Sequence, residues 1–223
     1  MKKIFAIMSA VVLLGFASLA NADDYFFSGT FTSDDEIKYL SFHLDEASPV
    51  VLRTYSYAGG TDSDGNVISG GGFDPVLSLF NSSYVFIDDS DDGDETAAGM
   101  KNVGVDAISG KQWDSYLVVE LTAGDYVVVL TQADNDFSGD PGDNISEGFE
   151  NQGAGNYTPE TIFDETGVVV TGSFWEEYEG VYNQRTGNWA VGVTSTPEPV
   201  SSILFGIGAG MIGIRRMRKN SRG

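Results

Sequence analysis

The sequence has no cysteine and a single histidine, His43, in 223 residues. Without cysteine there can be no thiol catalysis, thiolate zinc site or iron–sulfur cluster, and an exported form of the chain would depend on its core instead of disulfides. One histidine is too few for a histidine-based zinc site, and the Gly-x-Ser-x-Gly elbow of a serine hydrolase is missing. His43 stands in an alternating apolar and polar segment, so we interpret it as a strand residue and expect no enzyme.

Basic residues are also scarce between positions 23 and 196, where five of them face 32 acidic residues and leave a net charge of −27. Such a surface repels nucleic acid and anionic lipid, so we expect no nucleic-acid partner. Solubility accounts for most of these charges, and divalent metal ions and sugars are the ligands that fit them. The five basic residues are Lys38, Arg53, Lys101, Lys111 and Arg185.

The N-terminal segment predicts export. Two lysines follow Met1, an apolar run extends over residues 4–19, and Ala20-Asn21-Ala22 has the small-x-small pattern that signal peptidase cuts. The apolar run is short for a retained membrane anchor, which is the alternative. We therefore expect residues 1–22 to be a signal peptide that is removed after Ala22.

The C-terminal segment combines Pro197-Glu198-Pro199, an apolar stretch over residues 200–214 and a basic end over residues 215–223. At about 1.5 Å per residue the stretch spans roughly 22 Å, less than the ~30 Å of a hydrocarbon core, which suits temporary retention in the inner membrane. The basic residues would keep this terminus in the cytoplasm; they are Arg215, Arg216, Arg218 and Lys219.

This three-part order, over about the last 27 residues, resembles the PEP-CTERM sorting signal, and we delimit the sorting tail as residues 195–223. The resemblance implies cleavage near Pro197–Pro199 by a membrane-embedded exosortase in a Gram-negative bacterium that makes exopolysaccharide. It also implies an inner-membrane anchor before processing and a cell-surface, outer-envelope or matrix location afterwards. A simple tail anchor is the alternative, and either one places the remaining chain outside the inner membrane.

Residues 23–194 predict one all-β domain, a single β-sandwich of jelly-roll or Greek-key type, because short strands alternate with Gly, Asp and Asn turns and helical periodicity is missing. In the segment 36–44, Leu40, Phe42 and Leu44 should face the core. Thr122-Ala123-Gly124-Asp125 is a hairpin turn signal, and residues 58–73 read as a long loop. The expected strands are 25–31, 36–44, 49–57, 75–80, 84–87, 116–121, 126–132, 168–175 and 189–193.

Three motifs resemble the bacterial pre-peptidase C-terminal β-sandwich: the strand Phe73–Phe80, the acidic turn after it, and the segment Leu121–Tyr126. Most of residues 25–193, including Arg185–Ala190, also resemble PEP-CTERM proteins built on that sandwich. The resemblance implies a fold more than an activity.

The acidic run over residues 88–95 predicts a candidate calcium site, because carboxylates crowded together repel one another and Ca²⁺ takes six to eight oxygen ligands. An EF-hand does not fit, since Gly99 occupies the position of its bidentate glutamate, and a solvated acidic turn is the alternative. A second acidic loop contains Asp134-Asn135-Asp136 and residues 140–144. The candidate ligands are Asp74, Asp88, Asp89, Asp91, Asp92 and Asp94.

We expect a non-catalytic surface or matrix protein associated with extracellular polysaccharide. A carbohydrate-binding module is one alternative, and a carboxylate glycosidase, which needs only two suitably placed acids, is another. The run Glu176–Glu179 reads as an acidic surface stretch. Aromatic residues that would line a sugar site, or else pack in the core, are Tyr55, Tyr57, Trp113, Tyr157, Trp175, Tyr178 and Tyr182.

Overall fold

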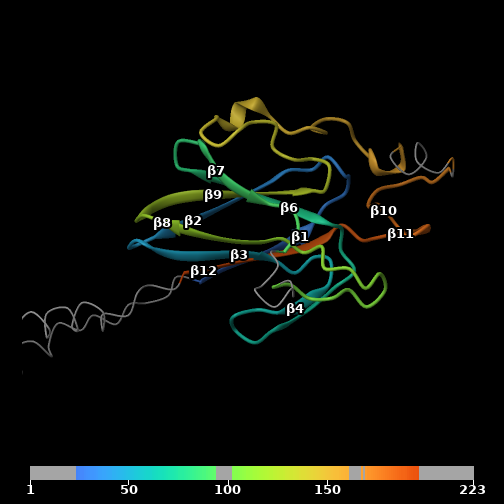
Figure 1. The fold of residues 1–223 in the computed structure, drawn as a ribbon, viewed down its shortest axis with the longest axis horizontal. Helices are drawn as coiled ribbons and strands as arrows, with labels where there is room; N and C mark the ends of the chain where they lie inside the picture. The colour runs from blue at the N-terminus through green and yellow to red at the C-terminus, as the bar shows by residue number, and fades with distance from the viewer. Residues whose placement is uncertain (1–23, 94–101, 161–166, 168, 196–223) are drawn as a thin grey trace, which may run out of the picture. The chain divides into compact units, whose positions relative to one another are not determined.

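The computed structural model describes residues 24–93, 102–160, 167 and 169–195, which form antiparallel sheets. Figure 1 shows two of these sheets stacked face to face, so the predicted β-sandwich is confirmed. The first sheet has the order β1 (Asp24–Thr30), β12 (Asn188–Ser195), β3 (Ser48–Thr54), β8 (Tyr116–Leu121). The second has the order β2 (Lys38–Leu44), β9 (Gly124–Gln132), β6 (Pro75–Asn81), β7 (Phe86–Ser90).

Apart from β6 and β7, consecutive long strands lie in opposite sheets. Strands β6 and β7 pair as a hairpin, as the short gap between the expected strands 75–80 and 84–87 predicts. The hairpin predicted at residues 122–125 is wrong, because β8 and β9 belong to different sheets. There the Tyr126 hydroxyl donates to the Thr122 carbonyl at 2.9 Å, which fixes the chain as it crosses between the sheets.

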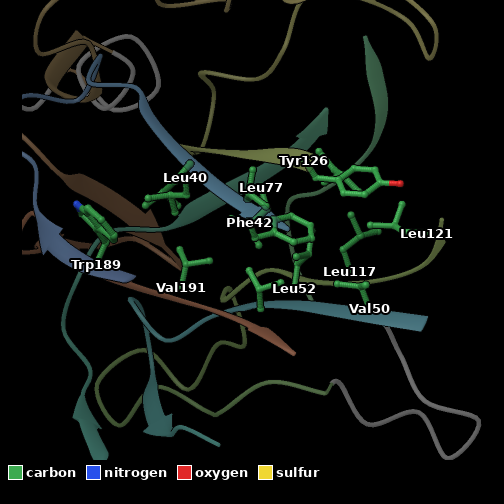
Figure 2. Close-up of a cluster of buried hydrophobic side chains, with 14 of the residues drawn as sticks. Leu40, Phe42, Val50, Leu52, Leu77, Leu117, Leu121, Tyr126, Trp189 and Val191 are labelled. Atoms are coloured by element: carbon green, nitrogen blue, oxygen red, sulfur yellow. The ribbon is translucent and has the colours of Figure 1, made fainter. Parts of the chain in front are cut away.

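Alternating side chains of the strands build the core between the sheets. Leu40, Phe42 and Leu44 of β2 are buried while Tyr39 is half exposed, as the alternation predicts. Figure 2 shows apolar side chains of β2, β6 and β9 pointing toward those of β3, β8 and β12. Each fully buried side chain of this size contributes about 1.5–3 kcal/mol, so burial is what holds the sheets together.

Two small hairpins depart from the sequence prediction. The predicted loop 58–73 contains β4 (Gly59–Thr61) and β5 (Val67–Ser69), which pair. The strand predicted over residues 168–175 begins only at Trp175, as β10 (Trp175–Tyr178), and pairs with β11 (Val181–Gln184). Glu179 and Gly180 between them both have positive φ, 52° and 80°, which is the tight primed turn that matches strand twist.

The first acidic run is partly strand. β7 covers Phe86–Ser90 instead of the predicted 84–87, because the β6–β7 turn extends through Tyr84 and pushes pairing toward the acidic residues. Helical residues within the described ranges are few: the short 3₁₀ turn Ile145–Glu147 and residues 158–160. No helix there is long and apolar enough to cross a membrane. The predicted signal peptide and positions 196–223 of the predicted sorting tail, including the stretch 200–214, lie outside the described residues.

Candidate functional site

A pocket of about 220 Å³ lies where β6 begins and β9 ends, next to the hairpin β10–β11. Figure 1 places this hairpin at one end of the two stacked sheets. We call this cavity the end pocket and use six of its lining side chains below. They are Asp74, Trp113, Gln132, Trp175, Glu176 and Arg185.

Neighbouring strands bring Asp74 and Gln132 together. Pro75 of β6 pairs with Gln132 of β9, and the Ala133 amide donates to the Asp74 carbonyl at 2.9 Å. Gln132 is only 4% exposed. The Oδ1 atom of Asp74 and the Oε1 atom of Gln132 are buried, and neither has a hydrogen-bond donor. A buried acceptor without a donor lowers the stability of the fold, so two such oxygens in one pocket suggest that a ligand supplies the donors.

Glu176 supplies a third acceptor from β10. It is 9% exposed, so the prediction that residues 176–179 are a surface stretch is wrong for this residue. Its Oε1 atom accepts a hydrogen bond from Nδ2 of Asn183, its cross-strand partner, at 3.0 Å. Its Oε2 atom is buried without a donor at hydrogen-bond distance. The Tyr57 hydroxyl, which donates to Ser109 at 2.8 Å, lies close enough to lower the pKa of Glu176.

Arg185 is fully engaged. It is 6% exposed, and its Nε and Nη2 atoms donate to the carbonyls of Gly72 and Tyr57 at 3.0 and 2.8 Å. Both Nη atoms also contact the Asp106 carboxylate, at 2.9 and 3.3 Å, whereas Glu176 is 3.6 Å away. The guanidinium lies 4.0 Å from the centre of the Tyr57 ring. Asp106 is therefore the main counter-charge of Arg185.

The motif Arg185–Ala190 owes its pattern to close packing. A Cβ atom on Gly187 would lie 2.0 Å from the Phe31 carbonyl oxygen, so only glycine fits there. Trp189, two residues further on, is part of the main core. The motif therefore fixes Arg185 beside the end pocket and joins that region to the sandwich.

The carboxylates that line the end pocket or pair with Arg185 have different pKa shifts. Burial raises the pKa of Asp74 well above its usual value, and the charges of Asp91, Asp92 and Glu176 raise it further. Burial also raises the pKa of Glu176, although Asn183 and Arg185 oppose the shift. Burial would raise the pKa of Asp106 too, but hydrogen bonds from Arg185 and Ser109 outweigh it and lower that pKa.

The structure brings together only some of the predicted calcium ligands. Ser115 Oγ hydrogen-bonds the carbonyls of Pro75 and Asp91, 2.8 Å from the latter, which holds the first acidic run near Asp74. Asp88 and Asp89 are exposed on β7, and Asp89 lies instead near Asp136 of the second acidic loop. Asp94 lies outside the described residues. Within the described part, no cluster of three or more acidic or histidine side chains is arranged to hold a metal.

Of the seven aromatic candidates, only Trp113 and Trp175 line the end pocket. Tyr55, Tyr57 and Tyr157 are buried in packing. The remaining two, Tyr178 and Tyr182, are half-buried on the hairpin β10–β11.

Two further aspartates that look like surface charges in the sequence are buried and structural. The Asp34 carboxylate accepts hydrogen bonds from the Thr158 amide and hydroxyl and from the Phe174 amide, at 2.6–3.0 Å. Asp114 accepts from the Thr54 hydroxyl and two backbone amides at 2.8–3.0 Å. Both carboxylates tie loops together, in contrast to Asp74.

The end pocket thus offers acceptor oxygens, negative charge and two indole rings, which suits a ligand rich in hydrogen-bond donors. No protein-family model matches the chain, and no curated protein matches it. The proposed function therefore rests on the geometry of the pocket.

Proposed function

We propose that the chain is an exported, non-catalytic surface or matrix protein that attaches to extracellular polysaccharide through the end pocket. The observation that carries this proposal is the pairing of Trp113 and Trp175 with buried oxygens that have no donor. Sugar rings present hydroxyl donors at their edges and flat apolar faces that pack on aromatic rings. A small number of converging polar groups among aromatic side chains is typical of small-ligand sites.

Loss of binding in tryptophan variants would test this attachment. Trp113→Ala and Trp175→Ala should each weaken retention of the protein by exopolysaccharide of its host in affinity electrophoresis, because each removes a wall of the pocket. Tyr39→Ala is the matched control, since Tyr39 is 50% exposed on β2 and does not line the pocket. Unchanged retention of both tryptophan variants would contradict the proposal.

Export and sorting rest on the two terminal segments. We propose cleavage by signal peptidase after Ala22, transient insertion of residues 200–214 in the inner membrane, and exosortase cleavage near Pro197–Pro199. Intact mass of the protein from separate cell fractions tests the route. A form trimmed at both ends, in the outer envelope or medium, supports it, whereas a form that retains residues 200–223 in the inner membrane contradicts sorting.

One observation favours a second function, a carboxylate glycosidase. Asp74 and Glu176 line one pocket, and burial raises the pKa of both, as a general acid requires. Against it, Glu176 is held by Asn183 at 3.0 Å. Release of reducing ends from the exopolysaccharide, abolished by Asp74→Asn or Glu176→Gln, would establish the enzyme and replace the non-catalytic proposal.

A further inference from the structure

The end pocket has acceptors in excess of donors. Its orphaned oxygens are Asp74 Oδ1, Gln132 Oε1 and Glu176 Oε2. The N–H groups of Arg185 point to the carbonyls of Gly72 and Tyr57 and to Asp106. A ligand that fits the pocket must therefore supply several hydrogen-bond donors and require few donors from the protein.

A primary ammonium group has this character, because it carries three N–H donors and no acceptor. Its number of donors equals the number of orphaned oxygens contributed by Asp74, Gln132 and Glu176. Gln132 and Glu176 are 4% and 9% exposed and line the end pocket, so they are buried side chains at the wall of a cavity and not part of a solvated surface.

Charge also favours a cation. The carboxylates of Asp74, Asp134, Glu176 and Glu177 line the pocket, and Arg185 is the one cationic side chain among its described lining residues. Asp106 already compensates Arg185 through two contacts of 2.9 and 3.3 Å. The indole rings of Trp113 and Trp175 add surfaces that attract a cation.

We propose that the end pocket binds a primary ammonium group carried by an amino sugar whose amine is free. This inference rests on the proposed attachment to polysaccharide and names the kind of sugar that it would select. A cavity of about 220 Å³ with two indole walls takes a sugar ring together with its ammonium group. A lysine side chain or a polyamine brings only a narrow alkyl chain to the same walls.

Calorimetric titration of the exported protein with glucosamine oligosaccharides and N-acetylglucosamine oligosaccharides of equal length tests the inference. Acetylation removes the charge and two donors, so the free-amine oligomer should bind at least tenfold more tightly. Equal affinity would overturn the inference while leaving attachment to polysaccharide intact. Binding of host exopolysaccharide but of neither oligomer would also overturn the inference alone, whereas no binding of any of the three would overturn both.

Isosteric variants locate the binding. Asp74→Asn and Glu176→Gln should each weaken binding of the free-amine oligomer about tenfold or more, because each removes a charge-assisted acceptor. Glu120→Gln is the matched control, since Glu120 is exposed on β8 and makes the same change in net charge. Melting temperatures verify that each variant is folded. Unchanged affinity in folded Asp74→Asn and Glu176→Gln proteins would overturn the assignment to this pocket.

The source of the ammonium group needs its own measurement. Nα-acetyl-lysine amide presents the same group without a sugar ring, and we expect it to bind at least tenfold more weakly than the glucosamine oligomer. Equal affinity for the two would mean that the ring contributes nothing and would overturn the assignment to an amino sugar.

Discussion

Asp106 pairs with Arg185, whereas Asp74 only lines the same pocket as Arg185, and the two carboxylates have opposite surroundings. The Asp106 carboxylate accepts hydrogen bonds from the Arg185 guanidinium and from the amides of Ile108 and Ser109, at 2.7–3.3 Å. Asp74 leaves Oδ1 buried without a donor. The pKa of Asp106 is lowered as a result, while the pKa of Asp74 is raised.

The contrast separates a carboxylate that stabilises the fold from one that we propose binds a ligand. A carboxylate whose hydrogen bonds are complete stabilises the fold and offers little to a ligand. A buried carboxylate without donors costs stability, and that cost is recovered only when a ligand supplies the donors. Substitutions of Asp106 and of Asp74 should therefore change the stability of the fold in opposite directions.

Arg185→Met should have the largest effect. It leaves Asp106 buried without its counter-charge, and removal of one partner of a buried pair costs about 3–5 kcal/mol. Urea unfolding of the variant measures the loss. The double variant Arg185→Met with Asp106→Asn should recover part of it, and a loss below about 1 kcal/mol in the single variant would show that the pair is not the anchor of this region.

Asp74→Asn should increase the free energy of unfolding by about 1 kcal/mol, because it removes a charge from a site that lacks donors. The same unfolding measurement gives the sign. Asp106→Asn is the matched substitution at the carboxylate that pairs with Arg185, and it should lower stability. If both variants lose stability equally, the difference in surroundings has no energetic consequence.

The pH dependence sharpens the same comparison. Because the pKa of Asp74 is raised in the folded state, its carboxyl destabilises the fold increasingly as pH rises from its usual value of 3.8 through the folded value. The advantage of Asp74→Asn should therefore grow over that interval. Asp106 has a lowered pKa, so its contribution is present above 3.8 and is lost as pH falls. Unfolding series from pH 3 to pH 8 that show parallel curves for the two variants would contradict this.

Calcium should have the smallest effect on stability. If the run of residues 88–94 binds Ca²⁺ together with Asp74, millimolar calcium should raise the melting temperature by a few degrees. Asp91→Asn and Asp92→Asn should abolish the shift. A calorimetric scan without any shift would leave the run as a solvated acidic segment and the end pocket as the candidate ligand site.

The sequence predicted the sandwich because the apolar alternation is strong where strands are long. Leu40, Phe42 and Leu44 are buried as expected, and β8 has the predicted bounds. The hairpin prediction at residues 122–125 is wrong because the residues of a turn do not indicate whether the next strand pairs with the previous one or crosses to the other sheet. Pairing depends on contacts between distant segments, which local patterns do not contain.

The end pocket was largely hidden for a related reason. Asp74, Trp113 and Trp175 are among the predicted candidates, but the sequence places Glu176 on the surface because its neighbours are acidic. Two signals were available: Glu179-Gly180 is a plausible tight turn between alternating segments, and Arg185 is one of only five basic residues between positions 23 and 196. Which acid Arg185 would pair with is a tertiary property and followed only from the structure.

The first and last strands of the sandwich are hydrogen-bonded neighbours, with Asp24 opposite Thr194, and β12 also pairs with β3. Until β12 arrives, the first sheet lacks its second strand and the core lacks Trp189, Val191 and Val193. A chain that crosses a membrane from its N-terminal end would therefore stay incompletely folded, and able to pass through a translocation channel, until its last strand emerges. Such end-to-end closure makes folding slow, on the order of milliseconds to seconds. In a chain exported as proposed, this delay would place folding after translocation.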